Sequence, residues 1–185
     1  MNTDHSNPDR KVIRPRRMLM AAVAVSMLAT GVAIGLWRIK PQTPQAPVDW
    51  VFELAFPDPQ GQQVSMSAVR GQLTLVNFWA TWCPPCVEEM PELSRFHQEM
   101  SPTGVHVIGL AVDSPSSVRE FLATRTFSYP LLITGASGTE LAKRLGNAVE
   151  ALPYTVLIDA KGNVLKQKVG RIREEEMKLW ISQVR

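Results

Sequence analysis

Runs of apolar residues that suit β-strands alternate along the chain with segments in which apolar residues recur at helical spacing. Residues 73–79 form a continuous β-type run, which predicts a buried strand. In the next segment Met90, Leu93 and Phe96 share one face of a helix, and Val87 extends that face. The same patterns predict further strands over 51–56, 105–112, 129–134, 154–159 and 164–169, and helices over 138–145 and 173–184. Strands that alternate with helices, followed by a hairpin and a last helix, predict an α/β fold.

Short polar segments mark the expected turns. Residues 58–61 and 160–163 combine glycine with aspartate, proline or asparagine, and the second of these turns closes a predicted β-hairpin. Ser114 followed by Pro115 predicts the start of another helix. Residues 64–69 are compatible with a strand or with a short helical turn.

The N-terminal region is first basic and then uncharged. Residues 1–17 contain five basic and two acidic residues, and the 20 residues 18–37 contain no charge. A helix of that length rises ~30 Å, which matches the hydrocarbon core of a bilayer. The positive-inside rule places residues 1–17 in the cytoplasm and the chain beyond residue 37 across the membrane. We expect one transmembrane anchor over 18–37. A cleaved signal peptide is the alternative, and both arrangements export the rest of the chain.

The remaining chain divides into a tether and a domain. Residues 38–49 hold three prolines between polar residues, which is typical of a semi-extended tether. Residues 50–185 are long enough to bury their own hydrophobic core. Beyond residue 40 the chain has 15 acidic and 13 basic residues, although the whole chain carries +3. The basic character therefore belongs to the N-terminal region, and no nucleic-acid-binding face is expected on the domain.

The candidate chemistry lies at Cys83 and Cys86, the only two cysteines. A disulfide between them closes too small a loop to stabilise the fold much. Thiol exchange explains the spacing better, because one thiolate can attack a substrate disulfide while the second thiol resolves the mixed disulfide. The pair follows the strand 73–79 and opens the next helix, whose first turn tolerates Pro84 and Pro85. Cys83 is therefore expected at or near the helix N-cap, where the helix dipole favours a thiolate.

Metal and haem sites fit the pair less well. A structural zinc site commonly needs two such cysteine pairs, and the chain has one. A c-type haem attachment needs a histidine directly after the second cysteine, where the chain has Val87. Copper(I) binding by both thiolates stays open as an alternative, although His97 and His106 do not form a spaced pair of ligands. We expect the chemistry to need no cofactor.

Residues 78–86, with the sequence Phe-Trp-Ala-Thr-Trp-Cys-Pro-Pro-Cys, resemble the active-site signature of the thioredoxin superfamily. They are most similar to that of the membrane-anchored TlpA/ResA-like thiol–disulfide oxidoreductases, and the resemblance covers about residues 51–185. It implies a thioredoxin-like fold, in which helices flank a central mixed sheet, with an N-terminal strand extension and an inserted strand–helix unit. Peroxiredoxins share this fold but carry a Pro-x-x-x-Thr-x-x-Cys arrangement that is missing here.

The resemblance also implies roles for residues around the cysteines. Pro153 matches the family's cis-proline, which faces the pair, and Leu152 and Pro153 are expected to bind a substrate strand. Glu89 matches the acidic residue that ResA-like proteins carry next to the active site. If it is partly buried, it has a raised pKa and exchanges a proton with Cys86. Trp82 is expected to shield the disulfide and to form part of the partner surface.

Other positions near the pair give further expectations. Thioredoxins proper carry a buried aspartate at the position of Asn77, and asparagine cannot exchange a proton, so Glu89 is the better candidate. Glu88 and Glu92 are expected on a solvated helix face, Pro91 is expected to bend the helix, and Trp79 is expected in the core. The two prolines remove backbone donors near the Cys83 sulfur, which predicts a less oxidising pair.

The expected activity is thiol–disulfide exchange in the periplasm, or outside the cell in a single-membrane bacterium, by an enzyme with a single-pass anchor in the inner membrane. The resemblance implies reduction of selected client proteins, such as apocytochrome c or copper-site assembly proteins. It also implies electrons from a membrane thiol carrier of the DsbD/CcdA kind. A net oxidant or isomerase similar in role to DsbA is the first alternative. A copper-binding assembly factor is the second, although related Sco-type proteins use Cys-x-x-x-Cys and a distant histidine.

Overall fold

The computed structural model describes residues 46–184 of the chain. The basic residues 1–17, the expected anchor over 18–37 and the tether up to residue 45 lie outside the described residues. Within 46–184, every helix is too short or too polar to cross a bilayer.

The described chain begins with short elements that pack beneath the main sheet. They are a 3₁₀ helix η1 (Asp49–Glu53), the antiparallel strands β1 (Ala55–Pro57) and β2 (Gln63–Ser65), and a second 3₁₀ helix η2 (Met66–Val69). The prediction of a strand over 51–56 is wrong for residues 51–54. Val51 and Phe52 are consecutive and both fully buried in one core, whereas a strand would point them to opposite faces. A helical turn lets both side chains reach that core.

A five-stranded mixed sheet forms the centre of the domain. Its strands are β3 (Leu73–Trp79), β4 (Val105–Ala111), β5 (Leu131–Ile133), β6 (Tyr154–Asp159) and β7 (Val164–Val169), in the order β5-β4-β3-β6-β7. The first three strands are mutually parallel, and β6 and β7 run antiparallel to their neighbours. The predicted strands at 73–79, 154–159 and 164–169 are confirmed with these bounds, and the central strand is buried along its whole length.

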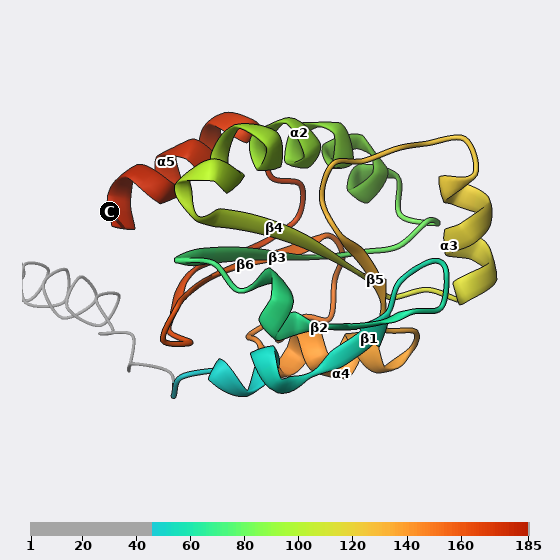
Figure 1. Cartoon of the computed structure of the whole chain (residues 1–185), viewed down its shortest axis with the longest axis horizontal. Helices are drawn as coiled ribbons and strands as arrows, with labels where there is room; N and C mark the ends of the chain where they lie inside the picture. Colours follow the sequence, from blue (N-terminus) through green and yellow to red (C-terminus); the bar gives the residue numbers. More distant parts are fainter. Residues whose placement is uncertain (1–45, 185) are drawn as a thin grey trace, which may run out of the picture. The chain divides into compact units, whose positions relative to one another are not determined.

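Within residues 46–184, four α-helices connect or follow the strands of the central sheet. They are α2 (Pro84–Met100), α3 (Pro115–Leu122), α4 (Ser137–Arg144) and α5 (Glu174–Val184). Figure 1 shows α2 and α5 together on one face of the sheet, α4 with β1 and β2 on the other, and α3 at one end. The strand β5 and the helix α4 lie between α3 and the final hairpin. The N-terminal extension forms a two-stranded sheet of its own, separate from the central sheet.

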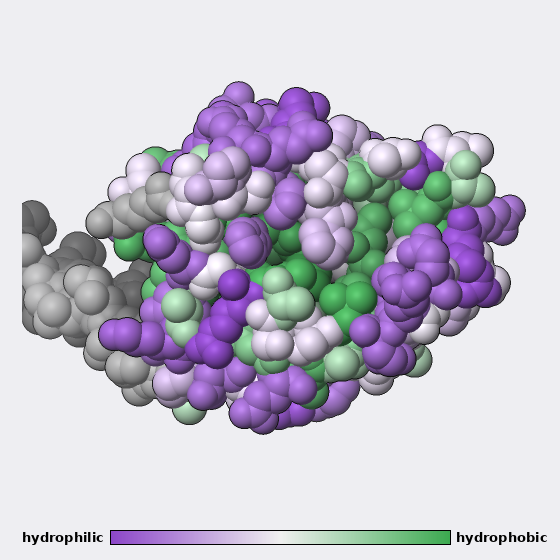
Figure 2. Space-filling view, viewed as in Figure 1, coloured by the Kyte–Doolittle hydropathy of each residue, from purple (hydrophilic) through white to green (hydrophobic). Residues whose placement is uncertain are grey.

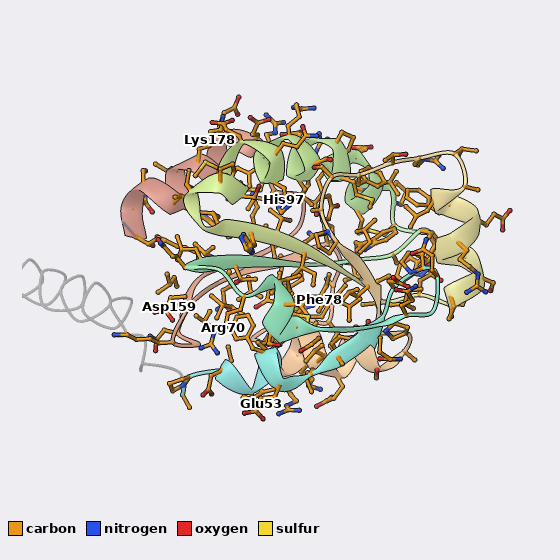
Figure 3. The ribbon with its side chains drawn as sticks, in the orientation of Figure 1. Glu53, Arg70, Phe78, His97, Asp159 and Lys178 are labelled. Carbon is orange, nitrogen blue, oxygen red and sulfur yellow. A yellow bond between two sulfur atoms is a disulfide. The ribbon has the colours of Figure 1, made fainter. Side chains whose placement is uncertain are left out.

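The alternation along β3 divides the interior into two cores. Leu75 and Trp79 belong to the core under α2 and α5, whereas Val76 and Phe78 belong to the core on the side of α4. Figure 3 shows Phe78 on the lower side of the sheet and His97 beneath α2. The imidazole Nδ1 of His97 accepts a hydrogen bond of 3.1 Å from the N–H of Val107 on β4. Because side chains alternate along a strand, Asn77 faces α2 together with Leu75 and Trp79, although it is polar.

An apolar hollow lies at the β5 end of the sheet. Figure 2 shows polar atoms over α2 and the outer side of α3, with apolar atoms gathered between them. A cavity of about 520 Å³ opens there, and its lining includes Leu122, Phe127 and Leu131. Neither cysteine lines this cavity, so it is separate from the candidate chemistry.

Candidate active site

The two cysteines form a disulfide at the point where the chain passes from the central strand into α2. Cys83 is the N-cap residue of the helix, and Pro84 and Pro85 occupy its first turn. The carbonyl oxygen of Cys83 accepts hydrogen bonds from the N–H groups of Cys86 and Val87, at 3.1 and 3.2 Å. The predicted strand-to-helix position and N-cap placement of Cys83 are both confirmed. The geometry places the Cys83 sulfur at the positive end of the helix dipole.

The two cysteines differ in exposure. Cys83 keeps 4% of its accessible surface, while Cys86 keeps none. Of the two cysteines, only Cys83 therefore retains any exposed surface. Buried residues on both sides of the pair, including Trp79, Ala80 and Met90, belong to the same core.

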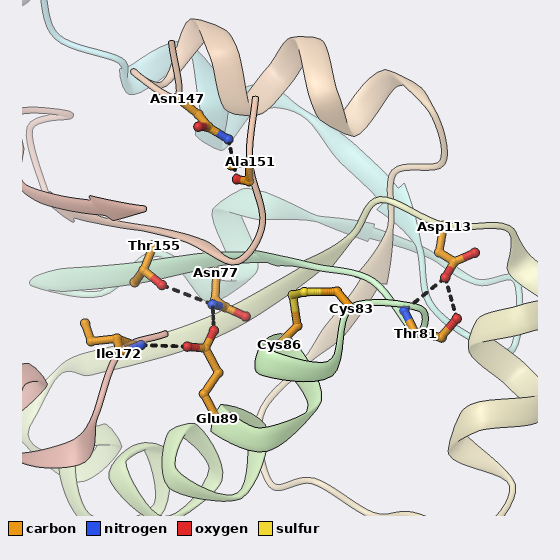
Figure 4. The surroundings of a disulfide bond; sticks show 10 residues. All are labelled: Asn77, Thr81, Cys83, Cys86, Glu89, Asp113, Asn147, Ala151, Thr155 and Ile172. Atoms are coloured by element: carbon orange, nitrogen blue, oxygen red, sulfur yellow. Dashed lines mark hydrogen bonds between the residues drawn. A yellow bond between two sulfur atoms is a disulfide. The ribbon is translucent and has the colours of Figure 1, made fainter. Parts of the chain in front are cut away.

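Glu89, one helical turn after Cys86, is fully buried between α2 and the sheet. Its Oε1 accepts a hydrogen bond of 2.7 Å from Asn77 Nδ2, and its Oε2 accepts one of 2.7 Å from the N–H of Ile172. Asn77 Nδ2 also donates to Thr155 Oγ1 at 3.0 Å. Figure 4 shows the side chains of Glu89 and Cys86 leaving α2 on the side of the sheet.

Burial dominates the electrostatics of Glu89. Loss of hydration raises the pKa of this carboxyl to about 7, although the hydrogen bonds from Ile172 and Asn77 and the charges of Arg171 and Lys168 lower it. The sequence predicted a raised pKa for Glu89 if its side chain was at least partly buried, and the structure shows both the burial and the raised pKa. Such a group changes its charge near neutral pH, where a thiol also gains or loses its proton.

An exposed aromatic side chain lies next to the disulfide in the sequence. Trp82 precedes Cys83 and is 66% exposed. A cavity of about 90 Å³ lies against Trp82 and Leu152, and its lining also includes Asn147. These side chains bring the active-site turn and the segment before β6 together on one surface.

The peptide bond between Leu152 and Pro153 is cis, as expected from the resemblance. Pro153 is buried, and its carbonyl oxygen accepts a hydrogen bond of 2.8 Å from the N–H of Gly170. Leu152 is partly buried and packs against the core that contains both cysteines. The structure thus brings Leu152 to the same region as the disulfide.

The glutamates on either side of Glu89 hold the segment between β7 and α5. Arg171 pairs with Glu88 at 2.7 Å and with Glu92 at 2.9 Å, and Glu92 accepts the N–H of Glu174 at 2.9 Å. The last bond is the main cause of a lowered pKa at Glu92. The expectation that Glu92 lies on a solvated face is wrong, because Arg171 and the first residue of α5 contact its carboxyl group and leave its side chain 19% exposed. Glu88 is exposed as expected, although it is paired.

A second contact that sequence reasoning missed holds the active-site turn. Asp113, just after β4, accepts hydrogen bonds from the N–H and the hydroxyl of Thr81, at 3.0 and 2.6 Å. Burial raises the pKa of Asp113, but the bonds from Thr81 and Ser114 outweigh it and the pKa is lowered. A polar residue directly after a predicted strand was the available signal. The partner, 32 positions earlier, could not be read from it.

The described residues 46–184 contain no group of three or more histidine, cysteine and acidic side chains placed to hold a metal ion.

Comparison with known proteins identifies the family. The model of the Redoxin family matches residues 45–179. The chain belongs to the Redoxin family. Among curated relatives, "Thiol-disulfide oxidoreductase ResA" of Halalkalibacterium halodurans is 30% identical over 129 residues, which cover 69% of each chain. "Sporulation thiol-disulfide oxidoreductase A" of Bacillus subtilis is 28% identical over 125 residues, which cover 65% of this chain and 73% of the relative.

A solved structure supports the same conclusion. The crystal structure of a thioredoxin-related protein from Neisseria meningitidis serogroup B is 29% identical, with a TM-score of 0.62. The match covers 69% of this chain and 96% of that one. This Redoxin-family chain has a thioredoxin-like fold and is a thiol–disulfide oxidoreductase with a redox-active Cys83–Cys86 pair.

Proposed function

We propose that Cys83 is the attacking thiol and Cys86 the resolving thiol. In the reduced enzyme, the Cys83 thiolate attacks one sulfur of a client disulfide and forms a mixed disulfide. The other client sulfur leaves as a thiolate and takes up a proton. The Cys86 thiolate then attacks Cys83, closes the Cys83–Cys86 disulfide and releases the second client thiolate. Two electrons pass from the enzyme to the client. The observation that carries this assignment is that Cys83 keeps a small exposed surface of 4%, whereas Cys86 keeps none.

Glu89 handles the proton of Cys86 in this scheme. Cys86 must lose a proton before it attacks the mixed disulfide, and a buried thiolate needs a nearby group that takes that proton. Glu89 lies one helical turn away, is fully buried, and has a pKa raised to about 7 by burial. Its carboxylate accepts the proton from Cys86 and returns it when the disulfide is reduced again.

Trp82, Leu152 and Pro153 form the client-binding surface. Trp82 offers a large exposed apolar face directly before Cys83, and Leu152 lines the same small cavity. An extended segment of the client lies along residues 151–153, and one apolar side chain of that segment packs against Trp82. This surface places the client disulfide over the Cys83 sulfur.

The enzyme acts outside the cytoplasm, held to the inner membrane by residues 18–37 with residues 1–17 in the cytoplasm. The uncharged segment and the basic residues before it support this location. In an oxidising compartment a tethered thiol enzyme is useful as a reductant of selected proteins. We propose apocytochrome c or copper-site assembly proteins as clients, and a membrane thiol carrier of the DsbD/CcdA kind as the electron donor. Both assignments come from the resemblance to TlpA/ResA-like proteins.

A trapping experiment tests this function. Cys86→Ala in the full chain, expressed in intact cells, leaves the mixed disulfide at Cys83 without a resolving thiol. Acid quenching, followed by separation without reductant and mass spectrometry, then names the trapped clients and donor. Cys83→Ala is the matched control and should trap nothing. The function as a reductant is contradicted if Cys86→Ala captures no partner, or if its partners accumulate in their reduced form when the enzyme is absent. The second result would favour a net oxidant.

A further inference from the structure

Asn77 lies at the centre of a buried polar cluster on the face of the sheet that α2 covers. Its Nδ2 donates to Glu89 Oε1 at 2.7 Å and to Thr155 Oγ1 at 3.0 Å, while its Oδ1 has no hydrogen-bond partner. Asn77, Glu89 and Thr155 are all fully buried. A buried polar atom without a partner costs free energy, so the orphaned Oδ1 requires a physical reason.

The present arrangement suits only the charged form of Glu89. The carboxylate has two donors, the amide of Asn77 and the N–H of Ile172. When Glu89 gains a proton, its new O–H needs an acceptor. Neither partner can accept in its present position, because each presents an N–H to the carboxyl group.

Turning the amide over resolves this conflict. Rotation by about 180° about χ2 of Asn77 exchanges its oxygen and nitrogen, and this torsion is broad and roughly two-fold. Oδ1 then lies between Glu89 and Thr155, where it accepts the O–H of the neutral acid. It also accepts the O–H of Thr155, because a hydroxyl can donate as well as accept. Nδ2 then occupies the place without a hydrogen-bond partner, which costs free energy. The bond that Oδ1 accepts from Glu89 offsets this cost, so the turned orientation is favoured only while Glu89 carries its proton.

We propose that Asn77 is a positioning residue whose side-chain amide turns over each time Glu89 gains or loses its proton, so that both forms of the acid stay in one place, a helical turn from Cys86. The inference rests on the proposed role of Glu89 in proton transfer. It explains why an amide, which exchanges no proton itself, occupies this buried position on the central strand.

The charges around Glu89 are compatible with a change of state near neutral pH. The positive charges of Lys168 on β7 and of Arg171 just after β7 favour the carboxylate. Burial favours the neutral acid, and it is the larger effect. The phenol of Tyr129, before β5, is buried and stays protonated, since burial and the charge of Glu89 both raise its pKa. On α2, Glu92 is paired with Arg171. The groups that β3 and β6 contribute to the cluster are uncharged.

Nuclear magnetic resonance of the oxidised full chain, labelled with ¹⁵N and ¹³C, tests the proposal from pH 5 to pH 9. The Glu89 carboxyl carbon reports its proton, and the Asn77 side-chain NH₂ signals report the amide. We expect both to change with one midpoint near pH 7. Asn147 is an internal control: its Nδ2 donates to the Ala151 carbonyl at 2.9 Å and its Oδ1 is also unpartnered, so its side-chain amide is bonded to a backbone carbonyl and not to a carboxyl group. Its NH₂ signals should not follow that midpoint.

The outcomes separate this inference from the proposed function. If Glu89 titrates while the Asn77 signals show no change, the amide does not turn over and only the inference fails. If Glu89 shows no titration between pH 5 and pH 9, its proton role fails and the inference fails with it. Asn77→Leu removes both hydrogen-bonding ends, and we expect the Glu89 midpoint to rise by about one pH unit, because a bond to a charged acceptor is stronger than one to a neutral group. An unchanged midpoint in this variant contradicts the proposal.

Discussion

Glu89 Oε2 accepts a 2.7 Å hydrogen bond from the backbone N–H of Ile172, a residue 83 positions further along the chain. This bond joins the active-site helix α2 to the segment that leads into α5. Among the described residues, Glu89 is the one acidic or basic side chain that is fully buried. Whatever changes its charge therefore acts on the packing of two helices and on the neighbourhood of Cys86 together.

Glu89→Gln should change how stability depends on pH. The pKa of Glu89 is raised from 4.5 to about 7 in the folded chain, so between these values the folded state binds more protons than the unfolded state. The free energy of unfolding of the wild type therefore falls as pH rises through this window and levels off above pH 7. Relative to the wild type, Glu89→Gln should gain about 2–3 kcal/mol between pH 5 and pH 8.

Urea unfolding of the oxidised proteins at both pH values measures this difference. Glu99→Gln is the matched control, because Glu99 lies on the same helix but is exposed and paired with Lys178. It should shift by less than about 0.5 kcal/mol. A pH dependence that is the same in Glu89→Gln and in the wild type would show that Glu89 does not titrate in this window.

Glu89→Gln should also change the pH profile of catalysis. The carboxylate form takes the proton from Cys86, so wild-type kcat for disulfide reduction should rise with pH through an inflection near 7. The glutamine variant should lack this inflection and be slower by about 10²-fold at pH 7.5, with KM unchanged. Stopped-flow reduction of a model protein disulfide provides the measurement. An inflection retained in the variant would assign the proton transfer to another group.

Asp113→Asn should loosen the active-site turn. Asp113 holds both the N–H and the hydroxyl of Thr81, two residues before Cys83. We expect a loss of about 1–2 kcal/mol in stability and an exchange rate about 10-fold lower, since the attacking sulfur is less well oriented. Asp58→Asn is a matched control, because Asp58 accepts the N–H groups of Gln60 and Gln62 in the turn between β1 and β2. Asp58→Asn should lose stability while its thiol–disulfide exchange rate stays the same as in the wild type. Equal exchange rates in Asp58→Asn and Asp113→Asn would contradict this account.

Trp82→Ala should weaken client binding without affecting the chemistry at sulfur. The exposed indole provides apolar contact area beside the disulfide, and its loss should raise KM for a protein disulfide about 10-fold, or about 1.4 kcal/mol. The rate with a small disulfide such as oxidised glutathione should not change. Leu179→Ala removes a comparably exposed apolar side chain from α5 and should leave both rates as they are. A similar loss with both substrates would assign Trp82 to the support of the cysteines instead.

The sequence was sufficient to locate the five strands of the central sheet and the cysteine pair, although the strand expected over 129–134 is limited to Leu131–Ile133. A seven-residue apolar run such as 73–79 is unambiguous, and a cysteine pair directly after it must fall where the strand ends. Periodicity also predicts the buried face of α2 with Met90, Leu93 and Phe96, whereas the burial of Glu89 was left open and is shown by the structure. The error at 51–54 arose because a short apolar run suits a strand and a 3₁₀ turn equally well.

The long-range partners could not be predicted in the same way. Helical spacing shows that Glu88, Glu89 and Glu92 lie along one helix, but it does not show which segment covers them. That segment holds Arg171 and Ile172, and it reaches α2 only after the chain has passed through four further strands. Its position depends on the assembled sheet.

Selective alkylation of the reduced enzyme tests the central claim most directly. With substoichiometric iodoacetamide at pH 7, peptide mass spectrometry measures the separate rates at Cys83 and Cys86. Because Cys83 caps α2 and is the only one of the two with exposed surface, it should react at least about 10-fold faster than Cys86. Equal rates, or faster modification of Cys86, would contradict the assignment of Cys83 as the attacking sulfur.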